Sequence, residues 1–204
     1  MNIHFKEDIK NILEHEAKAL LDIPITKTYE EVVKIIVKSV HQNGGKLITS
    51  GMGKAGQIAL NMATTFSSTG TPACFLHPSE AQHGDLGIIR ENDIMLLLSN
   101  SGETKEIVQL IKLTLGLVSD MKFIVITSNP QSALGVKADY CLETGNPPEV
   151  CPLGLTPTTS TTMMTVIGDI LVVEIMKRIG FTCQDYAKRH HGGYLGSKSR
   201  NQSK

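Results

Sequence analysis

The first forty residues of the chain carry apolar side chains at helical spacing. One such pattern covers His4–Leu21 and a second runs from about Thr28 to Val40, with Pro24 between them. Because side chains three and four positions apart share one face of a helix, the sequence predicts two amphipathic helices. Asn43-Gly44-Gly45 is expected to end the second, since glycine readily takes the left-handed turn that follows a helix.

Beyond residue 45, short apolar runs alternate with longer helical stretches. The run Ile94–Leu98 is apolar without alternation, which is typical of a strand buried on both faces of a parallel sheet. Strands alternating with helices indicate an α/β fold with helices on both faces of the sheet, and such sheets bind ligands at the carboxyl ends of their strands. Strands are predicted at 46–50, 73–76, 94–98, 122–127 and 139–142, and helices at 54–68, 103–117 and 159–179.

Composition narrows the class of protein. The 204 residues suffice for one core but are few for two domains. Lys plus Arg and Asp plus Glu each number 20, so no basic surface for nucleic acid is indicated. Four scattered cysteines lack metal-binding spacing and are typical of reduced cytosolic thiols. With a charged N-terminus and no apolar run expected to reach the roughly 20 residues of a membrane span, we predict a cytoplasmic protein with no membrane partner.

The loop Ser50–Gly56 follows the first strand and contains G-x-G-x-x-G. A dinucleotide site would also need an acidic residue at the end of the second strand, where this chain has Leu76-His77-Pro78. A P-loop is disfavoured as well, because Lys54 is followed by Ala55 and not by Ser or Thr. Lys54 at a helix start is then either a solvated lysine or, as we favour, a cation aimed at an anion or a developing oxyanion.

The segment SNSGET lies between the third predicted strand and the next helix. Gly102 lets the backbone approach a ligand closely, and Ser99, Ser101 and Thr104 add hydroxyl donors to the free N–H groups of the helix start. One N-cap needs only one hydroxyl, so the surplus favours a phosphate monoester as ligand. Glu103 would repel an anion, so it either faces solvent or takes part in chemistry beside the phosphate.

Three further stretches carry polar side chains. LGLTPTTSTTMM crowds hydroxyls at the start of the last long helix, just after Glu149 on the stiff turn Pro147-Pro148. HPSEAQHGDLG holds two histidines and two acids, but they lack a recognised metal-ligand spacing, so we expect no metal. His190-His191 lies in a glycine-rich segment near the C-terminus.

In this order, the segments resemble the sugar isomerase (SIS) domain of the D-arabinose 5-phosphate isomerases from about Lys46 to Gly196. The resemblance implies a three-layer α/β/α sandwich around a five-stranded parallel sheet. It also implies interconversion of D-ribulose 5-phosphate and D-arabinose 5-phosphate without a cofactor, in a homotetramer with active sites between subunits. That reaction supplies the sugar Kdo. The segments are SGMGKAGQIA, FSSTGTPACFLHPSEAQHGDLG, LSNSGETKEI, PEVCPLGLTPTTSTT and HHGGYLG.

The resemblance also implies roles for individual residues. The catalytic candidates are Lys54, Glu103, Glu149 and His190. Glu149 or His190 is expected to be the base of a cis-enediol mechanism, Lys54 to stabilise charge, and His190 also to open the furanose ring. A carboxylate base works best where burial raises its pKa. Candidates for binding the substrate and its phosphate are Ser50, Gly51, Gly53, Ser99, Asn100, Ser101, Thr104, Thr158, Thr159 and His83.

This chain departs from the family pattern in three ways. HHGG replaces HPGG, Ala55 replaces a serine, and we expect the protein to lack the CBS domain pair that often follows the SIS domain. We therefore expect N-terminal helices over 1–45, an SIS domain over 46–196, a flexible tail over 197–204, and any feedback by the end product CMP-Kdo to act at the SIS site itself. Two alternatives stay open: a non-catalytic phosphosugar-binding module, and an isomerase of another ketose phosphate.

Overall fold

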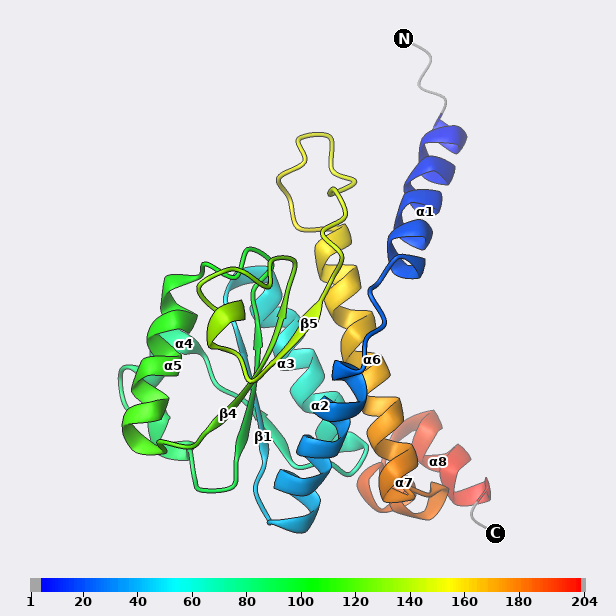
Figure 1. Cartoon of the computed structure of the whole chain (residues 1–204). Coiled ribbons are helices and arrows are strands. Elements are labelled where there is room, and N and C mark those ends of the chain that lie inside the picture. Colours follow the sequence, from blue (N-terminus) through cyan, green and yellow to red (C-terminus); the bar gives the residue numbers. More distant parts are fainter. Residues whose placement is uncertain (1–4, 203–204) are drawn as a thin grey trace.

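The computed structural model describes residues 5–202 of the chain and is shown in Figure 1. Its helices are α1 (Phe5–Leu21), α2 (Thr28–Ile36), the π-helix η1 (Val37–Gln42), α3 (Gly53–Ser68), α4 (Pro78–Ala81), the 3-10 helices η2 (Asp85–Ile88) and η3 (Gly135–Lys137), α5 (Lys105–Leu117), α6 (Thr159–Ile179), α7 (Cys183–Arg189) and α8 (Gly193–Gln202). Its strands are β1 (Leu47–Gly51), β2 (Ala73–Phe75), β3 (Ile94–Leu98), β4 (Lys122–Thr127) and β5 (Tyr140–Glu143).

The five strands form one parallel sheet in the order β2-β1-β3-β4-β5. In the sheet, β2 lies on one side of β1, and β3 lies on the other side of β1. The strand order therefore reverses between β1 and β3, which is where open parallel sheets bind ligands. The loops after β1 and β3 lie beside this switch point.

Alternate side chains of each strand enter two separate cores. Leu96 and Leu98 of β3 pack with α2, α3 and α6 on one face, whereas Met95 and Leu97 pack with α4 and α5 on the other. All four side chains are fully buried. The sheet therefore lies between two helical layers (Figure 1), and the predicted three-layer α/β/α fold is confirmed.

Two segments differ from the prediction. The helix from Thr28 ends at Ile36 and widens into η1, where the Asn43 N–H bonds the carbonyl of Lys38. Residues 197–202, expected to belong to a flexible tail, form the end of α8. Gly196 lets this helix pack on the backbone of His190, because a Cβ there would overlap that carbonyl. Residues 203–204 lie outside the described part of the chain.

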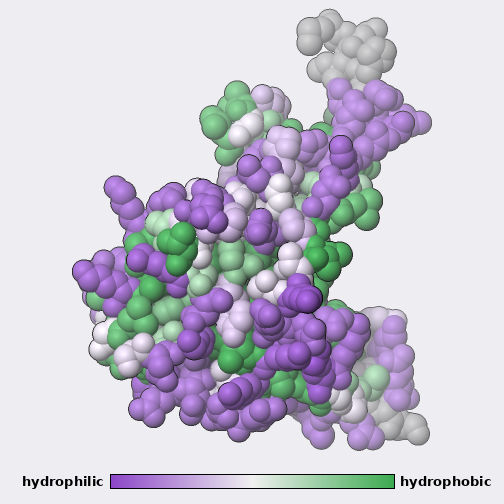
Figure 2. All heavy atoms as spheres, viewed as in Figure 1, coloured by the Kyte–Doolittle hydropathy of each residue, from purple (hydrophilic) through white to green (hydrophobic). Residues whose placement is uncertain are grey.

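Helix α6 corrects the expectation that no apolar run reaches the length of a membrane span. Its 21 residues are long and apolar enough to cross a membrane by length and composition. In this fold α6 is a core helix that packs against α3, with half of its apolar window buried. Helix α1 leans on α6 at the edge of the molecule (Figure 1), and Ala19 is its one buried residue. The loop between β5 and α6 projects beside α1, and its tip is hydrophobic in Figure 2, with Leu153 and Leu155 each 77% exposed.

Candidate active site

The loops after β1, β3 and β5 surround a cavity of about 370 Å³ at the carboxyl edge of the sheet. The first two loops come from the strands that flank the switch point, and the third brings in the start of α6. Six of the residues expected from the sequence line this cavity, namely Lys54, Ser99, Asn100, Ser101, Thr104 and Glu149. The fold therefore brings these six together from three separate segments of the chain.

The glycine loop is shaped by close packing of β1 against α3. A Cβ on Gly56 would lie 2.6 Å from the carbonyl oxygen of Gly51, so the two backbones can meet only without side chains. Ser50 is fully buried, and its Oγ donates to the Leu76 carbonyl at 2.6 Å. Gly53 turns the chain at φ +56°. Ser50, Gly51 and Gly53, expected to bind substrate, shape this loop and do not line the cavity.

Lys54 is the second residue of α3, and its exposed side chain lines the cavity. Within residues 5–202 it forms no ion pair. The N-cap residue Met52 makes no side-chain cap hydrogen bond, so the helix start keeps free N–H groups next to the ammonium. Both features present positive charge to the cavity.

The SNSGET turn forms a polar pocket at the start of α5. Gly102 has φ +69°, and a Cβ there would overlap the Ser132 side chain, so this position requires glycine. The hydroxyls of Ser99 and Thr104 lie 2.8 Å apart, and the Gly102 N–H donates to Ser99 Oγ at 3.1 Å. Thr104 is the N-cap of α5 but makes no side-chain cap hydrogen bond. The first N–H groups of α5 are thus left uncapped by this side chain beside two hydroxyls, an arrangement suited to a phosphate group.

In the described part of the chain, the backbone carbonyl of Asn100 is hydrogen-bonded, whereas its side-chain oxygen is not. Thr127 Oγ1 and Ser128 Oγ donate to its backbone carbonyl at 3.0 and 2.8 Å, which fixes the turn to the end of β4. Asn100 lines the cavity, and its Oδ1, which is buried from solvent, has no hydrogen-bond partner within residues 5–202. Because buried polar atoms are nearly always paired, this oxygen is suited to accept a hydrogen bond from a ligand hydroxyl.

Glu103 lies on the other side of this turn. Its Oε1 accepts a hydrogen bond from the Ala133 N–H at 2.9 Å, and its own N–H donates to Ser101 Oγ at 3.2 Å. The carboxylate therefore links the turn to the loop after β4, and it does not line the cavity. The sequence left two interpretations open for Glu103, and this contact favours a structural role over chemistry beside the phosphate.

The Glu149 carboxylate binds the backbone N–H groups at the N-terminus of α6. Its Oε2 accepts hydrogen bonds from the Thr158 N–H at 2.7 Å, from Thr158 Oγ1 at 2.8 Å and from the Ser160 N–H at 3.3 Å. Burial raises the pKa of Glu149, but the hydrogen bonds from Ser160 and Thr158 outweigh burial and hold the pKa below its ordinary value of 4.5. The balance is the reverse of a carboxyl group kept neutral by burial, so Glu149 is ionised at neutral pH.

The hydroxyls at the start of α6 divide between two tasks. Thr158 serves Glu149, and Thr159 is fully buried with Oγ1 donating to Glu16 Oε1 at 2.8 Å. Neither threonine lines the cavity, whereas Ser160 and Thr161 do. Helical geometry makes this choice, because successive residues of the first turn face different directions and only some can face the cavity.

The wall opposite the sheet is a compact turn built around Cys151. Its Sγ accepts the N–H groups of Leu155 at 3.3 Å and Thr156 at 3.2 Å. These hydrogen bonds, that of Thr156 first, lower the pKa of the Cys151 thiol to about 7. Gly154 and Leu155 of the same turn line the cavity.

The two histidine candidates lie apart from the cavity. His190 follows α7, where its ring stacks on Tyr186 with the ring centroids 3.7 Å apart. Between it and the cavity runs α6, whose 21 residues span about 30 Å at 1.5 Å each (Figure 1). His83 is exposed in the turn after α4 and does not line the cavity either. In residues 5–202 no three His, Cys, Asp or Glu side chains are grouped so that they could hold a metal ion.

Taken together, the cavity joins an open helix start with hydroxyls, a lysine, an unpaired amide oxygen and an ionised carboxylate. The helix start with its hydroxyls suits a phosphate group. The lysine, the amide oxygen and the carboxylate suit a hydroxylated carbon chain from which a carbon-bound proton is removed. Fold and cavity thus define an α/β protein with a cavity suited to a phosphorylated, hydroxyl-rich ligand at the switch point of its sheet. The chain belongs to the SIS domain family, which it matches over residues 41–174.

Its relatives include sugar-phosphate isomerases. It is 45% identical to the arabinose 5-phosphate isomerase KdsD of Yersinia pestis over 96% of this chain, but it spans only 58% of that protein's length. A Bacteroides fragilis structure, assigned by inference to phosphosugar isomerases involved in capsule formation, is 63% identical with a TM-score of 0.92, covering 93% of this chain and 99% of that one. An Escherichia coli CFT073 protein in complex with arabinose 5-phosphate is 34% identical with a TM-score of 0.81, covering 93% and 99%.

Proposed function

We propose that the protein is an aldose–ketose isomerase that interconverts D-ribulose 5-phosphate and D-arabinose 5-phosphate. One observation carries the proposal: a helix start left uncapped by its N-cap side chain and an ionised carboxylate, Glu149, line the same cavity as Lys54. The names of the curated relatives give the same activity, and the ligand of the Escherichia coli complex is the aldose of this reaction.

In the proposed reaction the start of α5 holds the phosphate and so fixes the sugar chain across the cavity. Glu149 removes the proton from C2 of the aldose, or from C1 of the ketose, and returns it to the other carbon, while the hydroxyl proton passes between O2 and O1 of the enediolate. Lys54 stabilises the negative charge that develops on the oxygens of the cis-enediol intermediate. Asn100 Oδ1 accepts a hydrogen bond from a sugar hydroxyl and orients the chain.

His190 requires a second subunit in this scheme. Because α6 separates it from the cavity of its own chain, we propose that the partner subunit's His190 completes each site of a homotetramer and opens the furanose ring. Exposed apolar side chains on α1, including Ile9 and Leu13, support association of subunits. We also propose that the active domain extends to residue 196, so that it includes His190.

The product would supply a cytoplasmic pathway to Kdo, in which the sugar enters lipopolysaccharide or a capsule. The capsule is favoured by the Bacteroides fragilis relative, whose assignment mentions capsule formation. Feedback by CMP-Kdo, if present in this chain, would act at the SIS cavity itself. Competition by CMP-Kdo against ribulose 5-phosphate is the assay for that regulation, and a lack of competition rejects it.

The experiment is to incubate the purified, chelator-treated protein with D-ribulose 5-phosphate and to measure D-arabinose 5-phosphate. We expect turnover, and we expect Lys54→Ala to abolish most of it. Tight binding of the sugar phosphate without turnover would favour the alternative of a non-catalytic phosphosugar-binding module. Turnover of a hexulose or heptulose phosphate in preference to ribulose 5-phosphate would favour an isomerase of another ketose phosphate.

A further inference from the structure

Helix α1 lies outside the matched family region, yet it contacts the segment that carries Glu149. Ala19 is its one buried residue, whereas Phe5 and Leu13 are 70% and 63% exposed. Apolar packing within the chain therefore holds α1 only weakly against the body. Its polar contacts carry correspondingly more weight, and two of them come from adjacent residues, His15 and Glu16.

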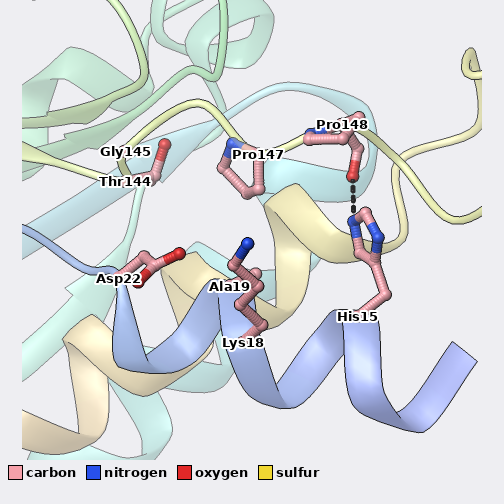
Figure 3. Close-up of a pocket in the computed structure, with 8 residues that line it drawn as sticks. All are labelled: His15, Lys18, Ala19, Asp22, Thr144, Gly145, Pro147 and Pro148. Carbon is pink, nitrogen blue, oxygen red and sulfur yellow. Dashed lines mark hydrogen bonds between the residues drawn. The ribbon is translucent and has the colours of Figure 1, made fainter. Parts of the chain in front are cut away.

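The first contact reaches the residue before Glu149. His15 Nε2 donates a hydrogen bond to the carbonyl oxygen of Pro148 at 2.9 Å (Figure 3). Because Pro148 directly precedes Glu149, this bond fixes the backbone from which the carboxylate extends.

The second contact reaches the helix start to which Glu149 binds. Glu16 Oε1 accepts the Thr159 hydroxyl at 2.8 Å, and Thr159 is fully buried. Its neighbours Thr158 and Ser160 supply the two N–H groups that bind Glu149 Oε2. Glu16 thus anchors the first turn of α6 at the residue between the two donors.

Packing cannot replace the His15 bond, because a cavity of about 260 Å³ separates α1 from the loop after β5. Lys18, Asp22 and Pro147 line it, as Figure 3 shows. At Gly145 the loop comes close to Asp22, the residue after α1, because a Cβ there would lie 3.4 Å from the Asp22 carbonyl oxygen. Between that point and Glu149, the described structure gives His15 as the side chain that bonds the loop to α1.

We propose that His15 and Glu16 are positioning residues that hold Glu149 at its place in the cavity, one through the chain before it and the other through the helix start that receives it. The catalytic part of this inference rests on the proposed function. Misplacing a reacting group by about 1 Å can cost roughly a hundredfold in rate, so loosening either anchor should lower kcat more than it raises KM.

The test compares alanine and glutamine at both positions with two controls on the same helix. We expect His15→Ala and Glu16→Ala each to lower kcat about tenfold with KM changed less than twofold. His15→Gln keeps a donor near Nε2 and Glu16→Gln keeps the Oε1 acceptor, so both should restore most of the rate. Glu14→Ala, which removes an exposed partner of Lys10, and Lys18→Ala, which removes a cavity-lining side chain, should match the wild type.

Alanine variants that turn over like the controls would overturn the proposal, and so would glutamine variants no better than alanine. A second readout does not depend on activity: hydrogen exchange at the Thr158 and Ser160 amides, which Glu149 holds. Both alanine variants should speed this exchange at least severalfold without lowering the melting temperature of the protein. If the wild type fails to turn over ribulose 5-phosphate, the proposed function fails, and this exchange still decides the inference: unchanged protection overturns it.

Discussion

Helices α5 and α6 begin at the same edge of the sheet, but their N-termini are used in opposite ways. The start of α5 is open: Thr104 leaves the helix uncapped and turns its hydroxyl to Ser99. The start of α6 is filled by the Glu149 carboxylate, which takes the N–H groups of Thr158 and Ser160. The free N–H groups of a helix start attract any anion. One helix therefore leaves this property available to an anion, which we propose is the substrate phosphate, and the other uses it to fix a protein carboxylate.

Removing the charge of Glu149 should have the largest effect. Glu149→Gln keeps the shape and one acceptor oxygen at α6 but removes the base, so kcat for ribulose 5-phosphate should fall about a hundredfold or more while KM changes little. Steady-state kinetics measure this, with Glu91→Gln, an exposed turn residue, as the matched control. Near-normal turnover by Glu149→Gln would show that another group is the base.

Distorting the turn that precedes α5 should have the next largest effect. Gly102→Ala places a Cβ at φ +69° and against Ser132, so the turn must shift and unfolding should become easier by about 1–3 kcal/mol. Inhibition by inorganic phosphate should weaken at least tenfold. Gly116 in α5 has open space around it, so Gly116→Ala should instead stabilise the protein by roughly 0.5–1 kcal/mol. Unchanged phosphate inhibition in Gly102→Ala would place the phosphate elsewhere.

Paired threonine variants sharpen the comparison further. Thr104→Val removes a hydroxyl from the open start, and loss of one hydrogen bond of about 1 kcal/mol should raise KM about fivefold without changing kcat. Thr158→Val removes one of three hydrogen bonds to Glu149 Oε2, so it should lower kcat severalfold and leave KM unchanged. A reversed pattern, with kcat lost at Thr104 and KM raised at Thr158, would exchange the roles of the two helix starts.

The sequence was sufficient to place the strands of the sheet and to place the SNSGET turn at the cavity. A parallel strand buried on both faces needs a continuous apolar run such as Ile94–Leu98, so all five strands could be placed within a residue or two. SNSGET could be interpreted because glycine and hydroxyls between a strand and a helix leave few alternatives. The different roles of the hydroxyl residues at the start of α6 could not be predicted. Thr158 and Ser160 stand two positions apart in one run of hydroxyls, and only the fold shows that Thr158 is the N-cap and that Ser160 lines the cavity.

Contacts between residues far apart in the sequence also could not be predicted. His190 resembles a site residue by motif, but α6 carries the chain away from the cavity before reaching it. The reverse holds for α1, whose His15 and Glu16 meet Pro148 and Thr159 across more than 130 residues of sequence. Local patterns carry no signal for such contacts, because side-chain periodicity describes one element at a time.

The smallest expected effect concerns pH. Because the folded pKa of Glu149 is lower than its ordinary 4.5, its hydrogen bonds stabilise the fold above that value, and this stability is lost as pH falls through the lowered pKa. The melting temperature of the wild type minus that of Glu149→Gln should therefore stay constant from pH 8 to about 5 and narrow only below 4.5. A difference that already changes between pH 8 and 6 would contradict the lowered pKa.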